Sequence, residues 1–394
     1  MSQNKIAKKV QNLQSSAIRE LLKHSKMDGV ISLGGGIPNP DLFDREGLQI
    51  AMDQVLSSAW KEAFQYGLSE GSPELRAAIC QLLAERAIVC DVDDVVVTSG
   101  SQQSLDILAR ALIDPGDIVV VERPTYLAAL QVLQLAEADL RSVGTDGDGM
   151  IIDELEALVK TTPVKAVYIV PTFGNPGGVT LAEHRRKQLV ELSQRYDFVI
   201  IEDDPYGEIN FTDKTFTPLK AWAAESGNSD NVIYTSTFSK ILAPGARVGW
   251  LVVPGWLKRQ VVNLKQATDL HTSSLSQSLT YHYLNSGRLA GQIALIREAY
   301  KHKCQTLCEQ LESALGDHLT FHKPMGGMFL WARFNYPMDT TQWLKKTLAN
   351  GVVYVPGEFF YCNDPDHATL RMSYVSVTDE NLKEAVLRLK ASLN

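Results

Sequence analysis

The sequence predicts an α/β protein with a mostly parallel sheet between layers of helices, for three reasons. From residue 91 onward, strand-length apolar runs alternate with helical patterns, which is typical of a parallel sheet covered by helices. Polar residues follow the carboxyl ends of these strands. The chain has 394 residues, of which 45% are hydrophobic, so it is long enough for a second, smaller core.

The composition excludes several classes of function. A formal net charge of −8 offers no basic field for nucleic acid, and we interpret the basic run at residues 184–187 as the solvated face of a helix over residues 183–196. The polar N-terminus predicts no secretory signal, and the longest apolar runs are too short to span a membrane. The five cysteines include no C-x-x-C pair, which favours a reducing compartment. We therefore expect a cytoplasmic protein without nucleic-acid, membrane or metal partners.

Residues 1–30 have the pattern of one amphipathic helix that ends at Asp28-Gly29. Apolar residues at positions 18, 21 and 22 share one face of this helix, and Arg19 lies among them. The glycines Gly34–Gly36 follow in the segment ISLGGGIPNP. Glycine lets the backbone approach another group closely, although without context a plain loop is the better interpretation of such a triplet.

Residues 64–76 combine an extended segment with the start of a helix. Tyr66 lies in the extended part. Gly71-Ser72-Pro73-Glu74 begins the helix, with proline at its first position and an acid in its first turn.

The first strand and helix of the predicted sheet lie over residues 95–112. The run VVVTSG predicts a strand, and SQQSLDILARALI predicts a helix with Leu105, Leu108, Ala109 and Leu112 facing inward. Ser101 and Gln102 therefore stand at a helix N-terminus, where free N–H groups and the helix dipole favour an anion. Simple N-capping by Ser101 explains the same pattern equally well.

Further polar candidates follow the ends of later strands. They are Tyr126, Asn175, the pair Asp203 and Asp204, and Lys240. Because ligands of open α/β sheets bind at the carboxyl ends of the strands, we expect these side chains to meet at one rim. One acid of the Asp203–Asp204 pair can be a solvated loop charge.

The stretch YTSTFSKILAPGARVGW at residues 234–250 carries the most specific chemistry. Lys240 stands beside four hydroxyl residues, Thr235, Ser236, Thr237 and Ser239, and Arg247 follows a Pro-Gly bend. A single amine among phosphate-type donors suggests a Schiff-base lysine with an anionic cofactor. The alternative is a surface loop lysine beside a Ser/Thr-rich turn.

Together, the motifs SGSQQ, RPTY, NPGG, EDDPY, TFSK, PGARVGW, GGMFLW, VPGEFF and LRMSY resemble one family. The chain is similar to the fold-type-I pyridoxal-phosphate aminotransferases of class I/II, in the branch with 2-aminoadipate, kynurenine and aromatic-amino-acid aminotransferases. The resemblance implies a large domain over residues 45–290 with a mostly parallel seven-stranded sheet. It implies a smaller α+β domain from residues 1–44 and 291–394.

The same resemblance implies roles around the ring of pyridoxal 5′-phosphate. Lys240 binds the cofactor's aldehyde and then moves the proton of the reaction. Asp203 pairs with the pyridine nitrogen, which leaves the neighbouring aspartate spare. Asn175 and Tyr206 bond the phenolic oxygen, and Tyr126 stacks on the ring. Lys240, Asp203 and Tyr206 are thus the expected catalytic residues.

The resemblance also implies which residues bind the cofactor's phosphate and the substrate. The expected phosphate ligands are Ser101, Gln102, Thr237, Ser239 and Arg247. Arg371 and Asn175 bind the substrate, with Arg371 as a bidentate clamp on the α-carboxylate. Arg19 meets a distal acid of the substrate, and Gly35 and Gly36 lie near it. Family members are homodimers with shared active sites, in which Tyr66 reaches the partner's phosphate.

The implied activity is ping-pong transfer of an amino group between an α-amino acid and 2-oxoglutarate. The amino acid is expected to be aromatic, large and apolar, or similar to 2-aminoadipate. A lyase or decarboxylase of the same fold is an alternative, because it would share Lys240 and Asp203. A MocR-like regulator carries this domain behind a winged-helix module; we expect no such module here, because the resemblance starts within the first twenty residues.

Overall fold

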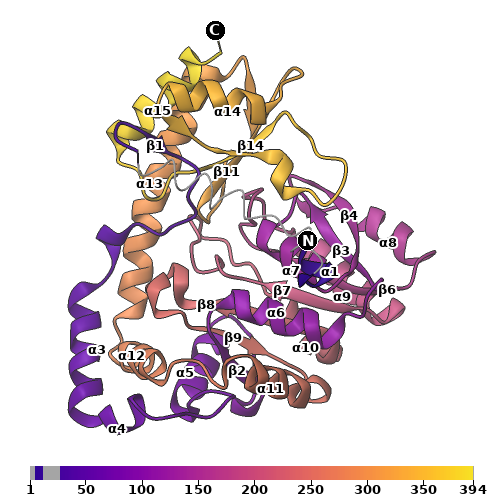
Figure 1. Cartoon of the computed structure of the whole chain (residues 1–394), viewed down its shortest axis with the longest axis vertical. Coiled ribbons are helices and arrows are strands. Elements are labelled where there is room, and N and C mark those ends of the chain that lie inside the picture. Colours follow the sequence, from indigo (N-terminus) through magenta and orange to yellow (C-terminus); the bar gives the residue numbers. More distant parts are fainter. Residues whose placement is uncertain (1–4, 12–26, 394) are drawn as a thin grey trace.

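The computed structural model describes residues 5–11 and 27–393, and Figure 1 shows them in two parts joined along one long helix. The lower part holds a large sheet with helices on both sides, and the upper part holds the C-terminal strands and helices. The joining helix is α13 (Leu289–Leu315). Its first turns pack with helices of the large part, and it also packs against the last helix of the chain.

The elements appear in the order that the sequence pattern predicts from residue 91. The remaining α-helices of the described residues are α1 (Lys8–Gln11), α3 (Arg45–Ser58), α4 (Trp60–Ala63), α5 (Pro73–Ala84), α6 (Ser101–Leu112), α7 (Leu127–Leu135), α8 (Ile152–Val159), α9 (Glu183–Tyr196), α10 (Leu219–Glu225), α11 (Gly255–Asp269), α12 (Ser274–Asn285), α14 (Thr340–Ala349) and α15 (Asp379–Ala391). Short 3-10 helices include η5 (Phe238–Lys240), η6 (Pro244–Ala246) and η7 (Gly357–Phe360).

The large sheet has the strand order β2-β9-β8-β7-β6-β3-β4-β5. Its strands are β2 (Val95–Thr98), β3 (Ile118–Arg123), β4 (Asp139–Asp146), β5 (Gly149–Met150), β6 (Val164–Ile169), β7 (Val199–Asp203), β8 (Val232–Thr237) and β9 (Gly249–Val252). The strands from β8 through β7, β6 and β3 to β4 are parallel, while β9 runs antiparallel to both of its neighbours. The eighth strand is β5, a two-residue hairpin partner of β4 that adds to the seven predicted strands.

Side chains alternate between the two faces of this sheet, and each face has its own helices. We call front the face that carries Tyr168 and Ile201, which packs on α6, α7 and α11. We call back the face that carries Val167, Ile200 and Tyr234, which packs on α8, α9 and α10 and, nearer β2, on α5 and α12. Both faces are therefore buried, as expected of a parallel sheet.

The upper part is built on a second sheet with the order β10-β11-β14-β13. Its strands are β10 (Leu319–Phe321), β11 (Phe329–Phe334), β13 (Val355–Pro356) and β14 (Thr369–Ser373), all antiparallel. A separate parallel pair joins β1 (Ile31–Ser32) to β12 (Val352–Val353), so the segment before the large domain pairs with the C-terminal part. The division at residues 44 and 290 remains a proposal.

The helix expected over residues 1–30 has only α1 in the described part, Gly29 lies in a turn, and Arg19 falls outside the described residues. The solvated face expected at residues 184–187 is wrong for Arg186, although His184 and Lys187 are exposed. Arg186 in α9 is 0% exposed, and it donates to the carbonyls of Leu181, Pro171 and Thr217. A helix that covers a sheet turns about half of its circumference inward, and a guanidinium can satisfy several carbonyls there.

Within the described residues, no helix is long and apolar enough to cross a membrane, and no group of His, Cys, Asp and Glu is arranged to hold a metal ion. The five cysteines are free thiols. Cys304 and Cys308 lie on α13 with the helical spacing expected from the sequence, and both are buried.

Candidate active site

The predicted site residues stand where strands of the large sheet end. Ser101 follows β2, Tyr126 follows β3 and Asn175 follows β6. Asp203 is the last residue of β7, and Lys240 follows β8 at the end of η5. Because these strands lie in one sheet, with β7 central, their ends form one rim.

Lys240 is a half-buried amine whose Nζ donates to the Gly36 carbonyl at 3.1 Å. Burial, together with the positive charges of Arg371 and Arg247, lowers the pKa of Lys240 to about 8, while Asp203 opposes this shift. An amine with a pKa near neutrality is available as a nucleophile at physiological pH.

Asp203 is a buried carboxyl, 2% exposed, on the front face of the sheet. Its Oδ2 accepts a hydrogen bond from the Tyr168 hydroxyl at 2.8 Å, and its Oδ1 has no partner among the described residues. Burial raises the pKa of Asp203 to about 7, and the Tyr168 hydrogen bond offsets part of this rise. A cationic partner on Oδ1 would favour the ionised form.

Asp204, the next residue, turns to the back face. Its Oδ2 pairs with Arg86, which follows α5, and accepts from the Tyr234 hydroxyl at 3.2 Å. The Asp204 side chain is fully buried, and that of Arg86 is 15% exposed. Asp204 therefore belongs to a buried ion pair behind the rim.

A chain of hydrogen bonds links Tyr206, Asn175 and Arg371. The Asn175 Nδ2 donates to the Tyr206 hydroxyl at 3.4 Å, and the Asn175 Oδ1 accepts from Arg371 Nη1 at 2.8 Å. Arg371 Nη2 donates to the Gly34 carbonyl at 2.7 Å. This chain joins β14 of the upper part to the rim of the large sheet.

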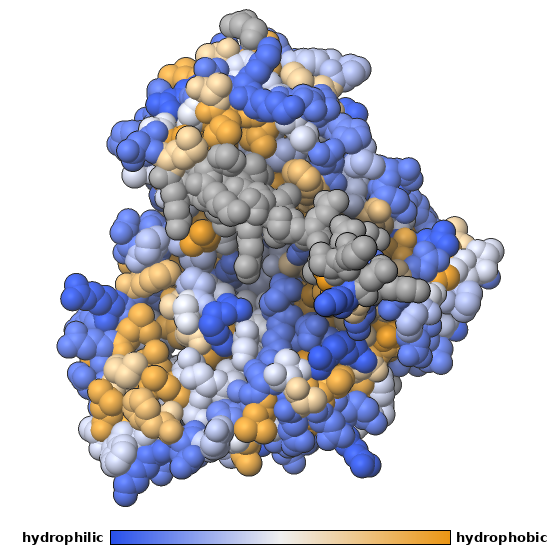
Figure 2. All heavy atoms as spheres, viewed as in Figure 1, coloured by the Kyte–Doolittle hydropathy of each residue, from blue (hydrophilic) through white to orange (hydrophobic). Residues whose placement is uncertain are grey.

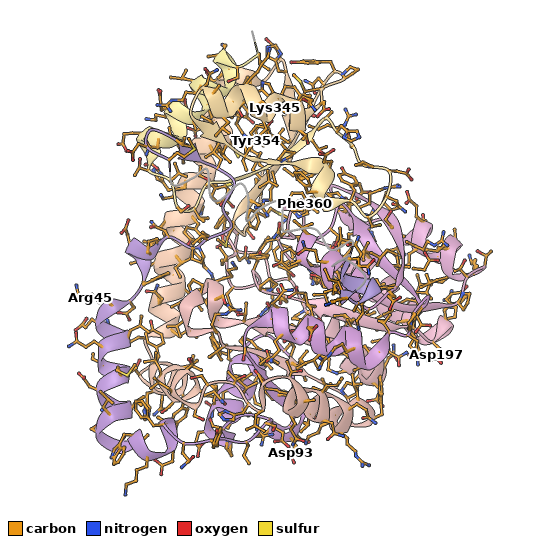
Figure 3. The ribbon with its side chains drawn as sticks, in the orientation of Figure 1. Arg45, Asp93, Asp197, Lys345, Tyr354 and Phe360 are labelled. Carbon is orange, nitrogen blue, oxygen red and sulfur yellow. The ribbon has the colours of Figure 1, made fainter. Side chains whose placement is uncertain are left out.

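Two aromatic rings flank the Arg371 guanidinium, which is 1% exposed. Its Cζ lies 4.2 Å from the ring centre of Phe329 and 5.0 Å from that of Phe360. Phe360 lies where the upper and lower parts meet (Figure 3). A side chain on Gly36 would place its Cβ 2.8 Å from the Phe329 ring, so this close approach requires glycine.

A cradle of backbone and arginine lies at the N-terminus of α6. The N-cap residue is Gly100, with φ +85° and no side chain to cap the first N–H groups. A Cβ on Gly100 would lie 2.4 Å from Arg247 Nη2, and one on Gly249 would lie 2.8 Å from the Ser101 nitrogen. Glycine thus keeps open a positively charged space of the kind that binds a phosphate.

Hydroxyl groups complete this cradle. The Thr237 Oγ1 donates to the Ser239 Oγ at 2.9 Å, and Arg247 Nη1 donates to the same Ser239 oxygen at 3.5 Å. Ser101 is partly buried and Gln102 is exposed at the first turn of α6. Two other hydroxyls noted in the sequence have structural partners: Thr235 donates to the Trp250 carbonyl and Ser236 to the Asp204 carbonyl.

The remaining expected site residues differ in exposure. Tyr66 is 78% exposed and packs edge-on against His271 at 5.8 Å. Tyr126 is partly buried beside the rim, and Gly35 is buried in the segment between Gly34 and Gly36.

Three residues of the site are absent from the sequence interpretation: Tyr168, Phe329 and Phe360. Phe329 and Phe360 lie within the motifs GGMFLW and VPGEFF, but a motif does not show which of its aromatic residues faces an arginine. Tyr168 carries the one hydroxyl in the apolar run AVYIV, which is a weak signal that it has a polar partner.

Comparison with known proteins decides the family. The family model for aminotransferases of class I and II matches residues 31–389. The chain belongs to this family. It is therefore a pyridoxal-phosphate-dependent aminotransferase, of the fold that the sequence motifs imply.

The relatives of this aminotransferase cover nearly its whole length. It is 41% identical to aromatic-amino-acid aminotransferase 1 of Thermococcus litoralis, over 98% of this chain and 93% of the relative. It is 32% identical to 2-aminoadipate transaminase of Thermus thermophilus, over 97% and 94%. The crystal structure of Pyrococcus horikoshii kynurenine aminotransferase, 38% identical, matches with a TM-score of 0.94 over 98% of this chain and 96% of that one.

The geometry fits the cofactor of the family. The orphaned Oδ1 of Asp203 offers a buried acceptor for the pyridine nitrogen. The glycine-lined cradle at α6 offers N–H groups and Arg247 for the phosphate. Lys240 offers an amine with a lowered pKa on the same rim. Each polar end of the cofactor therefore has a matching group in this aminotransferase.

Proposed function

We propose that this aminotransferase moves an amino group between an α-amino acid and 2-oxoglutarate by a ping-pong mechanism. Its amino donor is aromatic, large and apolar, or similar to 2-aminoadipate. The names of the relatives support this range, since they include enzymes for aromatic amino acids, 2-aminoadipate and kynurenine. The proposal of 2-oxoglutarate as the acceptor rests on the resemblance of the site motifs.

The observation that carries the proposal is the state of Arg371. The guanidinium is buried, yet among the described residues its hydrogen-bond acceptors are the neutral Asn175 Oδ1 and Gly34 carbonyl. Its Nε has no partner there. A buried cation without an anion is unfavourable, so the site is suited to an arriving carboxylate. An amino acid and an oxo acid both supply one, next to the carbon that reacts.

The remaining residues divide the chemistry between them. Bound pyridoxal phosphate supplies an electron sink for the pair of electrons released at the substrate Cα. Lys240 would hold the cofactor through its aldehyde, and its amine, when free, would move the proton at the substrate Cα. Asp203 holds the proton on the ring nitrogen. Asn175 and Tyr206 bond the phenolic oxygen, and Tyr126 stacks on the ring.

The phosphate end relies on charge and on a helix terminus. We assign the phosphate to the N–H groups at Ser101 and Gln102, to the hydroxyls of Thr237 and Ser239, and to Arg247. Borohydride reduction should attach the cofactor to Lys240. Recovery of the label on Lys265, another buried lysine, would overturn this assignment.

A panel of amino acids and oxo acids tests the reaction. An amino acid alone should change the absorption of the bound cofactor in one half-reaction, and 2-oxoglutarate should restore it in the other. Conversion of more than one equivalent of amino acid per site without any acceptor would instead indicate a lyase or decarboxylase.

Two matched variants test the clamp. Arg371→Lys should raise KM about 100-fold for both amino and oxo acids, because lysine cannot replace a bidentate guanidinium. Arg333→Lys, on the exposed side of β11 where Arg333 pairs with Asp366, should leave KM unchanged. Equal effects of the two substitutions would remove the support for the proposed substrates.

We also propose a homodimer whose partner completes each site. Exposed apolar side chains gather on α3, α4 and the following segment: Ile50, Leu56, Trp60, Phe64, Tyr66 and Leu68. Figure 2 shows an apolar area over the end of the molecule where α3, α4 and α12 lie. Such surfaces mark protein contacts, and Tyr66 would then reach the partner's phosphate. A fully active monomer in sedimentation would overturn this assembly.

The contact of Arg19 with a distal acid group stays a prediction, because the residue is outside the described part of the chain. The cytoplasmic location expected from the free cysteines is likewise a proposal, and cell fractionation tests it.

A further inference from the structure

Tyr168 donates a hydrogen bond to the proposed catalytic aspartate, Asp203. It lies on β6, opposite Ile201 of β7, so Tyr168, Ile201 and Asp203 share the front face of the sheet. Its ring is 1% exposed within the front core, and its hydroxyl donates to Asp203 Oδ2 at 2.8 Å. The packed ring leaves the hydroxyl little freedom to point elsewhere.

In this hydrogen bond Tyr168 is always the donor and Asp203 the acceptor. Burial raises the pKa of Tyr168 well above its ordinary value of 10, so the phenol keeps its proton and remains a donor at physiological pH. An ionised carboxylate gains more from such a donor than a protonated carboxyl does. The charges that also bear on Asp203 are those of Lys240, which favours ionisation, and Asp204, which opposes it.

We propose that Tyr168 is a positioning residue that keeps Asp203 ionised and turns its free oxygen, Oδ1, toward the ring nitrogen of the cofactor. This inference rests on the proposed role of Asp203. Tyr168 occupies Oδ2, so the remaining oxygen is the acceptor for the ring. Because the donor lowers the basicity of Asp203, the shared proton stays on the ring nitrogen, where it makes the ring a better electron sink.

The chain supplies a matched control on the other neighbour of β7. Tyr234 lies on β8, is also 1% exposed, and its hydroxyl bonds Asp204 at 3.2 Å on the back face. Tyr168→Phe and Tyr234→Phe each remove one buried hydroxyl and leave the packing of the ring intact. They differ in which aspartate loses its donor.

The test measures binding to the cofactor-free protein rather than turnover. Dissociation constants are compared for pyridoxal phosphate and for its carbocyclic analogue, in which a C–H group replaces the ring nitrogen. In the unmodified protein the analogue should bind more weakly, because it cannot pair with Asp203. Tyr168→Phe should reduce this preference about tenfold, as expected for a hydrogen bond to a charged group. Tyr234→Phe should leave the preference unchanged.

The possible outcomes distinguish the proposed role of Asp203 from the inferred role of Tyr168. An unmodified protein that binds both compounds equally would overturn the role of Asp203 and this inference with it. A strong preference that persists in Tyr168→Phe would overturn this inference alone. Equal losses of preference in the two variants would also contradict it, since the effect would then come from losing any buried hydroxyl in the sheet.

Discussion

On the front face at the end of β7, Asp203 receives one hydrogen bond from a neutral tyrosine. On the back face, the adjacent Asp204 is paired with Arg86 as well as with a tyrosine. One oxygen of each carboxyl, Oδ1, has no partner among the described residues. The two aspartates therefore differ in one respect: Asp204 has an arginine partner, Arg86, and Asp203 has none among the described residues.

This difference shows how the fold separates stability from chemistry. Arg86 neutralises the charge of Asp204, so this carboxylate has its counter-ion without any ligand. The front face holds a carboxyl whose pKa burial raises to about 7, and it lacks a cation until one is supplied. A buried group left without its counter-ion destabilises the protein alone but strengthens binding of the missing partner.

The largest expected effect comes from the front face. Asp203→Ala should lower kcat/KM about 1,000-fold, a loss of the size seen when one preorganised charge is removed from an active site. Thermal unfolding of the cofactor-free variant should not occur at a lower temperature, because the carboxyl that is removed has no counter-ion there. A larger loss of activity in Asp204→Ala than in Asp203→Ala would show that Asp204, and not Asp203, serves the cofactor.

The next largest effect is a loss of stability when the ion pair on the back face is broken. Arg86→Met should lower the free energy of unfolding by about 3 kcal/mol, because it leaves the buried Asp204 carboxylate without its cation. Denaturant unfolding measures this loss. Arg297→Met is the control, since Arg297 bonds Glu208, a neighbour of Arg86, but not Asp204. If both variants lost the same free energy of unfolding, the ion pair between Arg86 and Asp204 would not be the cause of the loss.

A smaller loss of stability is expected from Asp204→Asn, about 2 kcal/mol, because the amide keeps the shape of the carboxyl but not its charge. The affinity for pyridoxal phosphate should stay within a few-fold of the unmodified value. Fluorescence or absorption titration of the cofactor-free variant measures this affinity. A loss of affinity as large as that in Asp203→Asn would show that Asp204 also faces the cofactor.

When counted per pH unit, the smallest effect is a dependence of stability on pH. The pKa of Asp203 is about 7 in the folded protein and near 3.8 when unfolded, so only the folded state holds this proton between those values. The cofactor-free protein should therefore lose stability through this group as the pH rises from 5 to 7, by about 1.4 kcal/mol per pH unit near pH 5 and by about half of that near pH 7. Burial also raises the pKa of Glu202 to about 7 and that of Glu122 to about 8, which adds to the slope.

Subtraction isolates the contribution of Asp203. The same unfolding series with Asp203→Asn should have a slope that is shallower by about 1.4 kcal/mol per pH unit near pH 5. Parallel curves for the variant and the unmodified protein would mean that Asp203 is already ionised at pH 5 without the cofactor.

The sequence by itself determined the α/β class, the helix at residues 101–112 with its inward face, and the position of each polar candidate after a strand. These features depend on local patterns of apolar and polar residues, which are written along the chain. Family membership followed from motifs such as TFSK and EDDPY, and the family model confirms it. The roles of the individual site residues stay predictions.

Only the tertiary structure decided which partner each of these residues has. It turned Asp203 and Asp204 to opposite faces, placed Tyr168 against one and Arg86 against the other, and buried Arg186, which the sequence interpretation left in solvent. It also placed Arg371 between two rings. The partners of Asp203, Asp204 and Arg371 lie on other strands or in loops, tens to hundreds of residues away. Local patterns carry no record of such pairings, because the pairings depend on strand order, register and packing.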